Sequence, residues 1–133
     1  MIQYLLDTNM CIELIRQRST RILDRLRQCD MGQVGISVIT LAELEYGVEK
    51  SSRREQNRIA LGLFCAPLEL LPFTDHAAVE YGILHNTLER RGEVIGPMDL
   101  LIAAHALTDQ ATLVTSNERE FRRVEGLSVE NWR

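Results

Sequence analysis

Short apolar runs alternate along the chain with longer segments in which apolar residues recur every three or four positions. Short apolar runs bounded by turn formers are typical of buried strands, and the longer spacing is typical of helices. The predicted strands are residues 2–6, 34–38, 68–71 and 111–115, with a weak fifth at 127–129. The predicted helices are two pieces within residues 12–26, broken near 19–20, then 40–50, 54–64, a long one from 74–75 to 91, 97–107 and 117–123.

This alternation of strands and helices predicts an α/β fold. Parallel neighbouring strands need crossover connections, and helices that form those crossovers cover the two faces of the sheet. We therefore expect three layers, with a central, mostly parallel sheet of four to five strands flanked by helices. A chain of 133 residues falls in the commonest size range for one domain, so residues 1–133 are expected to form a single domain.

The composition excludes several classes of protein. Hydrophobic residues make up 45% of the chain and charged residues 26%, which argues against a disordered or fibrous protein. The apolar N-terminal stretch is interrupted by Asp7 and Asn9, so neither a membrane span nor a secretory signal is expected, and the protein is expected in the cytoplasm. Three widely spaced cysteines form neither a disulfide framework nor a zinc pattern, and reduced, mostly buried thiols are expected.

The charge distribution leaves room for local contacts with phosphates. The net charge is −4, which disfavours a protein that coats nucleic acid, but 14 of the 15 basic residues are arginine, the side chain suited to bidentate phosphate contact. The arginine groups are Arg16, Arg18, Arg21, Arg25 and Arg27; Arg53, Arg54 and Arg58; Arg90 and Arg91; and Arg119, Arg122 and Arg123. The sequence leaves open which of them are only solvated helix faces.

Acidic residues follow the predicted strands at the positions where parallel sheets carry their sites. Ligands bind beyond the carboxyl ends of such strands. Asp7 follows the first strand, Glu43 lies in the helix after the second and Asp99 opens a helix. Asn117 and Glu120 follow the fourth strand. Each can also be explained as a helix cap, and Thr40 with Glu43 and Asn117 with Glu120 both match the capping-box pattern.

Convergence of these carboxylates would give them a shared function. Carboxylates brought together repel one another, and a divalent cation removes that cost. An oxygen-rich set without histidine or cysteine suits Mg²⁺ or Mn²⁺, which can activate water and polarise a phosphoryl oxygen. Phosphodiester hydrolysis is therefore the expected chemistry. Neither GxxxxGK[ST], GxGxxG nor GxSxG occurs in the chain, and the three histidines lie in helical context, where a packing or surface role is expected.

Four blocks of the sequence, in this order and spacing, resemble the VapC toxins, which are PIN-domain ribonucleases of bacterial type II toxin-antitoxin pairs. The blocks are LLDTN at 5–9, SVITLAELEYG at 37–47, IGPMDLLIAAHA at 95–106 and LVTSNEREF at 113–121. The resemblance covers essentially the whole chain. It implies a PIN-like fold and an acidic quartet formed by Asp7, Glu43, Asp99 and, in the last block, Glu120.

The resemblance also implies roles for neighbouring residues and for partners. The supporting polar residues are Thr8, Asn9, Thr115 and Asn117, and the sequence leaves open whether Asn117 or Glu120 supplies the fourth position. Glu45 should point elsewhere, because it lies about 200° around a helix from Glu43. The family implies a Mg²⁺- or Mn²⁺-dependent endoribonuclease that inhibits translation by cutting RNA, with tRNA expected and the anticodon region of initiator tRNA favoured.

The family further implies a cognate VapB-type antitoxin, a toxin homodimer and a higher-order toxin-antitoxin complex. The apolar first helices, around Ile12, Ile15, Ile22 and Leu26, could form part of the antitoxin groove or could pack the core. Two other classes of function remain at this point. The chain could be a non-catalytic regulatory or interaction module whose acids cap helices, or a receiver-like phosphoacceptor domain, although it lacks the paired N-terminal acids and late lysine expected of a receiver.

Overall fold

A computed structural model describes residues 1–17, 19–30 and 32–133 of the protein. Five strands form one sheet in the described part of the chain. They are β1 (Tyr4–Leu6), β2 (Val34–Ser37), β3 (Glu69–Leu71), β4 (Thr112–Val114) and β5 (Val129–Glu130). The order across the sheet is β3-β2-β1-β4-β5, and each neighbouring pair is parallel. The predicted α/β fold with a parallel sheet of four to five strands is confirmed.

Seven helices connect the strands or follow them in the described residues. They are α1 (Thr8–Ile15), α2 (Thr20–Arg27), α3 (Val38–Lys50), α4 (Arg54–Cys65), α5 (Asp75–Arg91), α6 (Pro97–Asp109) and α7 (Glu118–Phe121). The expected break near residues 19–20 separates α1 from α2, and Arg18 of the first arginine group lies outside the described residues. Helix α5 stops at Gly92, whose φ of 66° is the left-handed conformation that glycine adopts without strain.

The predicted start of the third helix was wrong by two residues. The sequence pattern placed the cap at Thr40, but α3 begins at Val38 because the Ser37 hydroxyl accepts the Ile39 N–H at 3.0 Å. Thr40 is therefore a buried residue inside the helix and does not cap it. The shift moves Glu43 from the first turn of the helix to the second, where its carboxylate is free of a capping role.

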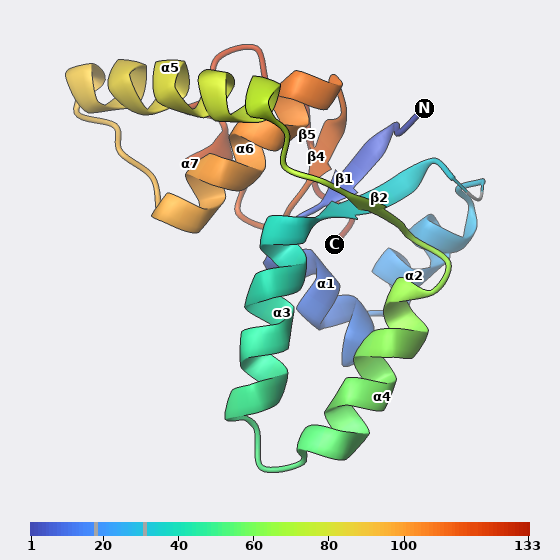
Figure 1. Ribbon diagram of the computed structural model, residues 1–133. Helices are drawn as coiled ribbons and strands as arrows, with labels where there is room; N and C mark the ends of the chain where they lie inside the picture. The colour runs from blue at the N-terminus through green and yellow to red at the C-terminus, as the bar shows by residue number, and fades with distance from the viewer. Residues whose placement is uncertain (18, 31) are drawn as a thin grey trace.

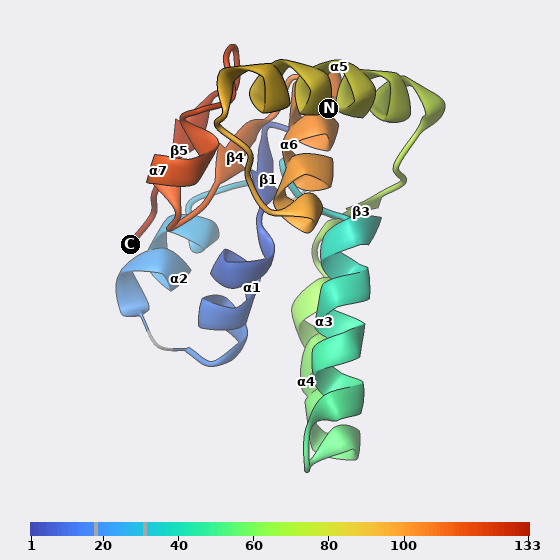
Figure 2. The same cartoon turned by 90° about the vertical axis from the view of Figure 1, so that its left-hand side faces the viewer.

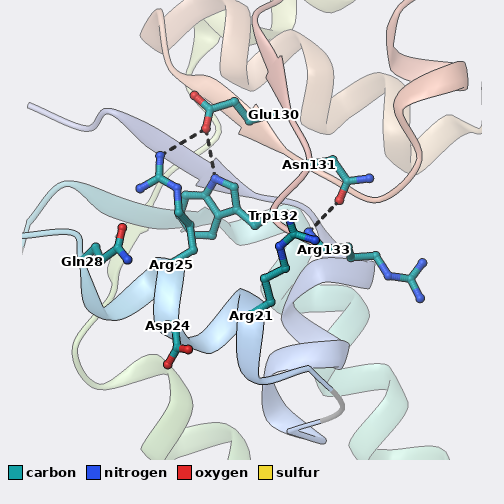
Figure 3. Close-up of a pocket in the computed structure, with 8 residues that line it drawn as sticks. All are labelled: Arg21, Asp24, Arg25, Gln28, Glu130, Asn131, Trp132 and Arg133. Carbon is teal, nitrogen blue, oxygen red and sulfur yellow. Dashed lines mark hydrogen bonds and ion pairs between the residues drawn. The ribbon is translucent and has the colours of Figure 1, made fainter.

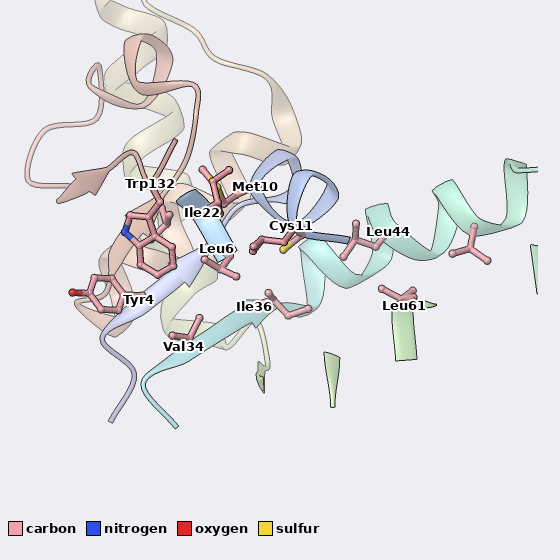
Figure 4. Packing of buried hydrophobic residues seen from close by; sticks show 13 residues of the cluster. Tyr4, Leu6, Met10, Cys11, Ile22, Val34, Ile36, Leu44, Leu61 and Trp132 are labelled. Atoms are coloured by element: carbon pink, nitrogen blue, oxygen red, sulfur yellow. The ribbon is translucent and has the colours of Figure 1, made fainter. Parts of the chain in front are cut away.

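Alternation within the strands places two apolar cores on opposite faces of the sheet. Successive side chains of a strand point to opposite faces. Leu6 and Val114 accordingly pack in the first core, with α1 to α4, whereas Leu5 and Leu113 pack in the second, with α5 and α6. Figure 4 shows the first core, in which residues of β1 and β2 meet α1 and the C-terminal Trp132. The sheet is thus the middle layer of three, as predicted.

The views in Figures 1 and 2 show how the helices are arranged around this sheet. Helices α3 and α4 form a pair that extends away from the sheet, and α1 lies beside α3. On the other face α5 lies across α6, and these two helices share an extensive contact. The amino end of α6 and the start of α3 therefore flank the same edge of the sheet.

Two further predictions from the sequence can be compared with the structure. None of the helices in the described segments is long and apolar enough to cross a membrane. All three cysteines are free, but only Cys11 is buried, because Cys29 and Cys65 lie at half-buried positions. Burial raises the pKa of the Cys11 thiol well above its ordinary value, so this side chain stays a neutral core residue.

Candidate active site

The acidic residues predicted from the sequence gather at the carboxyl edge of the sheet. Asp7 follows β1 directly, and its backbone N–H bonds the Val114 carbonyl of β4 at 3.0 Å. Asp99 lies in the first turn of α6, and Glu120 lies in α7 just after β4. The charges of Asp7, Glu43 and Glu120 each raise the pKa of Asp99, so the four carboxylates share one electrostatic environment.

Asp7 is the most buried member of this group, with 2% of its surface exposed. One carboxylate oxygen accepts the Met10 N–H at 2.8 Å and caps α1, and the other accepts the Thr115 hydroxyl. Burial raises the pKa of Asp7 to about 6, because desolvation disfavours the charged form more than these hydrogen bonds favour it. Glu13 and Glu43 raise this pKa further through their charge.

Asp99 has an even more perturbed carboxyl group. Its pKa is raised to about 7, first by burial and then by the charge of Glu120. A side-chain hydrogen bond between Asp99 and Glu120 also favours the protonated form of Asp99. The site therefore holds two carboxyl groups that ionise at a higher pH than an ordinary aspartate. Perturbed acids that cluster at a strand edge are typical of functional sites.

Glu43 is held by a side chain from the opening motif of the sequence. The Thr8 hydroxyl donates to the Glu43 carboxylate at 2.5 Å and lies 3.4 Å from the Thr40 hydroxyl. These contacts join α1 to α3 across 35 positions of the chain. Asn9, the third polar residue of that motif, is exposed in the first turn of α1. Glu45 points away and pairs with Arg58 of α4 at 2.6 Å, as its position around the helix predicts.

Asn117 and Glu120 do not form the capping box that their spacing suggested. The Asn117 side chain donates to Glu120 at 2.6 Å, and the backbone N–H of Asn117 bonds the Thr115 hydroxyl at 2.9 Å. The other Glu120 oxygen accepts the Gly96 N–H at 2.8 Å, at the start of α6. Asn117 thus orients Glu120 toward Asp99. Of these two residues, Glu120 is the one whose charge acts on Asp99.

Glu13 is a member of this environment that the sequence reasoning missed. It lies in α1, where 17% of its side chain is exposed, and its charge raises the pKa of Asp7. One of its oxygens lies 3.4 Å from the guanidinium of Arg133, and the other is buried without a hydrogen-bond partner among the described residues. No motif marks Glu13, because its neighbours are determined by how the C-terminus folds back on α1.

The C-terminal residues and α2 line a polar cavity of about 410 Å³ (Figure 3). The Arg25 guanidinium lies 5.7 Å from the centre of the Tyr4 ring and 5.2 Å from that of Trp132, and it pairs with Glu130 at 3.5 Å. Trp132 also donates its indole N–H to Glu130. These contacts fasten the end of the chain to α2 and β1, which places Arg133 beside Glu13.

Two of the arginines that follow β4 are used within the protein. Arg122 pairs with Glu118 at 2.7 Å, and Arg123 donates to the Val94 carbonyl at 3.2 Å. Exposed pairs of this kind contribute little to stability, yet they reduce the charge available to a phosphate. The structure therefore weakens the case for this group as an RNA contact, although Arg119 and Arg122 are both exposed.

The donor set at this edge fits a hard divalent ion. Asp7, Glu43, Asp99 and Glu120 offer only carboxylate oxygens, and the raised pKa values of the two aspartates show that their charges lack compensation. Within the described segments no three acidic, histidine or cysteine side chains already enclose a space for an ion. Thr8, Thr115 and Asn117 hold three of the carboxylates by hydrogen bonds.

Comparison with known proteins agrees with the fold. The model of the PIN domain matches residues 4–127 of the chain. Ribonuclease VapC2 of Rickettsia felis is 43% identical over 130 residues, which cover 97% of each chain. The tRNA(fMet)-specific endonuclease VapC of Shigella flexneri is 38% identical over 132 residues, or 99% of each chain.

A solved structure extends this similarity to three dimensions. The DNA-bound VapBC complex of Salmonella typhimurium contains a chain that superposes with a TM-score of 0.95 at 38% identity, over the full length of both chains. Identity near 40% over the whole length, together with the acidic edge, defines the family. The protein belongs to the VapC ribonuclease toxins, PIN-domain enzymes of VapBC toxin-antitoxin systems.

Proposed function

We propose that the protein is a divalent-metal-dependent endoribonuclease that cuts tRNA, with Asp7, Glu43, Asp99 and Glu120 as its catalytic carboxylates. The observation that carries this proposal is the mutual electrostatic effect of these residues at the carboxyl edge of the sheet. Such a cluster is costly unless a cation is bound. Mg²⁺ or Mn²⁺ suits a site made of carboxylate oxygens alone.

Each residue has a defined part in this proposal. Asp7 and Asp99 would hold the ion, with Glu43 and Glu120 completing the set directly or through water. When bound, the ion would polarise the phosphoryl group and favour ionisation of the attacking water. Thr115, Thr8 and Asn117 keep Asp7, Glu43 and Glu120 oriented through the hydrogen bonds described above. The exposed Asn9 is available to contact RNA at the rim of the site.

We favour tRNA, and specifically the anticodon region of initiator tRNA, as the substrate. The support is that the Shigella flexneri relative and a relative of Salmonella typhimurium, 39% identical over 132 residues, are both named tRNA(fMet)-specific endonucleases. A cut in the anticodon region would stop translation. RNA and the antitoxin would both be encountered in the cytoplasm.

Metal removal tests the proposed chemistry. Purified protein incubated with total tRNA in Mg²⁺ or Mn²⁺ should release fragments, and sequencing of the new RNA ends should place the cut in the anticodon region of initiator tRNA. EDTA should abolish cleavage, and excess Mn²⁺ should restore it. Cleavage that continues in EDTA would refute the metal-dependent mechanism, whereas metal-dependent cuts in another RNA would refute only the substrate.

A VapB-type antitoxin is the proposed partner, and a groove beside the site is its proposed contact. Side chains of α1, α3 and α4 line a cavity of about 200 Å³, and among them are Ile12, Ile15, Leu44 and Glu43. The lining of this groove is more apolar than polar, and it includes Glu43 of the acidic group. An antitoxin segment lying in it would obstruct the catalytic carboxylates. The Rickettsia felis and Salmonella typhimurium structures are themselves VapBC complexes, which supports such a partner and a higher-order complex.

Replacement of Ile15 by Asp should weaken antitoxin binding by about 100-fold or more, because a buried charge would face an apolar partner surface. Titration of the purified toxin with its cognate antitoxin, followed by calorimetry, measures the change. Ile59→Asp is a matched control, since Ile59 is an exposed isoleucine of α4 outside this groove. Equal losses in both variants would argue against the groove.

We also propose that two copies of the chain associate. Helix α5 exposes the apolar side chains of Val79 and Ile83 one turn apart, and Met98 is exposed at the start of α6. Exposed apolar groups of this kind are typical of interaction surfaces. Light scattering of the purified toxin should give twice the mass of the chain, and Val79→Asp with Ile83→Asp should give the mass of one chain.

A further inference from the structure

A buried contact between Ser37 and His105 connects the two helices that carry Glu43 and Asp99, without involving the four carboxylates. His105 of α6 is 1% exposed, and its Nδ1 lies 2.8 Å from the hydroxyl of Ser37, which is fully buried. The other ring nitrogen, Nε2, lies 3.1 Å from Asp109, and Phe73 packs edge-on against the ring with centroids 5.7 Å apart. His105 therefore makes its best hydrogen bond outside its own helix.

The surroundings make this hydrogen bond necessary. Ala103, Ala104 and Ala106 flank His105 in α6 and are fully buried in the second core. A polar ring in such a place costs free energy unless its nitrogens find partners. The contact between Nε2 and Asp109 is close but lacks the alignment of a hydrogen bond. Ser37 is consequently the well-aligned partner that compensates the buried imidazole.

One arrangement of protons satisfies both Ser37 and the Nδ1 atom of His105. The Ser37 oxygen accepts the Ile39 N–H, and its own proton can then point to Nδ1 of His105. The Nε2 proton faces the Asp109 carboxylate. Burial lowers the pKa of the imidazole, in agreement with a neutral ring. Ser37 is thus both the cap of α3 and the partner of α6, so it fixes the first turn of one helix against the middle of the other.

Each of the two helices carries one of the carboxylates. Glu43 lies six residues after Ser37 on α3, and Asp99 lies six residues before His105 on α6. Six residues of helix span about 9 Å, so a shift at the Ser37 contact is carried to both carboxylates by rigid backbone. Thr40, in the first turn of α3, is buried, and its hydroxyl lies 3.4 Å from the Thr8 hydroxyl that holds Glu43.

From this connection we infer that His105 is a positioning residue of the acidic site, which acts through Ser37 to set the spacing of Glu43 and Asp99. The inference rests on the proposed metal-dependent function. His105 touches neither the carboxylates nor the substrate, so it is not a catalytic residue. Residues that hold metal-binding side chains in place affect metal affinity or activity by 10- to 100-fold when they are replaced.

Two conservative substitutions distinguish the roles of the two ring nitrogens of His105. In His105→Asn the side-chain amide lies near the place of Nδ1 and can keep the bond to Ser37. In His105→Gln the amide extends toward the place of Nε2 and loses Ser37. Mn²⁺ affinity, measured by calorimetry on protein without RNA, should fall by about 10-fold or more in His105→Gln and remain within about 3-fold of the parent in His105→Asn.

Two further variants make the outcome decisive. His85→Gln, at a half-exposed histidine of α5, should leave Mn²⁺ affinity and RNA cleavage unchanged. Ser37→Ala should show the same loss of Mn²⁺ affinity as His105→Gln. It replaces His105→Gln in the test if that variant does not fold. If the parent binds Mn²⁺ and His105→Gln and Ser37→Ala bind it equally well, the positioning role is wrong. If the parent binds no Mn²⁺ and cuts no RNA, the proposed function fails, and the positioning role fails with it.

Discussion

The Asp7→Asn variant should lose RNA cleavage by at least about 10²-fold while it keeps its fold. Loss of one preorganised charged group at a site of phosphoryl chemistry has an effect of this order or larger. Asn is as good a helix cap as Asp, and its oxygen can still accept the Met10 N–H, so the stability of the metal-free protein should change by about 1 kcal/mol or less before charge is considered. Initial rates on tRNA at saturating Mn²⁺, together with circular dichroism, measure the two effects separately.

Asp75→Asn is the matched control for this experiment. Asp75 also lies at a helix start, in the first turn of α5, but it is exposed and distant in sequence from the acidic residues. It should retain full activity. Full activity of Asp7→Asn would contradict the mechanism and would favour the alternative that the acids only cap helices, so that the protein acts as a binding module.

The metal-free protein should lose stability as the pH rises, by on the order of 3 kcal/mol between pH 4 and pH 8. Asp7 and Asp99 have pKa values raised to about 6 and about 7, whereas both titrate near 3.9 in the unfolded chain. Their contribution to stability is therefore fully present below pH 4 and is lost as the pH rises through 6 and 7. Asp7 supplies most of the effect, because solvent screens the more exposed Asp99.

The titration of His105 changes the stability of the protein with pH in the opposite direction. Its contribution has to be distinguished from that of the two aspartates. Its pKa is lowered by burial, so its contribution is present above the ordinary value of 6.5 and is lost as the pH falls below it. The difference between the parent and Asp99→Asn removes this contribution, because both proteins contain His105. Asp99→Asn should have the flatter profile and be more stable than the parent at pH 8.

Urea unfolding in EDTA at pH 4, 6 and 8 measures these profiles. Saturating Mn²⁺ should restore stability to the parent at pH 8, by about 2.7 kcal/mol at a concentration 100 times the dissociation constant. The ion should have little effect at pH 5, where the aspartates hold protons. Parallel profiles for the parent and Asp99→Asn would show that Asp99 is not perturbed.

Much of this fold could be predicted from local patterns. Strand β1 is a short apolar run that ends at an N-capping aspartate, and α5 ends at a glycine, so the residues that start and stop these elements are adjacent in the sequence. The parallel sheet follows from the alternation of strands and helices. The positions of Asp7, Glu43 and Asp99 after strands and at helix starts were enough to propose one acidic edge, and their role as metal ligands remains a prediction.

The sequence misjudged positions where two local signals compete. Ser37 and Thr40 are both good caps, and the sequence pattern favoured Thr40 because Glu43 follows at the capping-box spacing. Ser37 caps α3 in the structure, and its hydroxyl also lies against His105, a residue 68 positions away. A contact between residues so far apart cannot be predicted from the pattern of about ten neighbouring residues.

The sequence by itself determined the fold class, the family and the carboxylates that could act together, because periodicity, capping and motif spacing are local properties. Only the tertiary structure decided how those carboxylates are held. Thr8 binds Glu43, Thr115 binds Asp7 and the C-terminus folds back beside Glu13. These contacts depend on packing between distant segments, and burial in that packing is what raises the pKa values of Asp7 and Asp99.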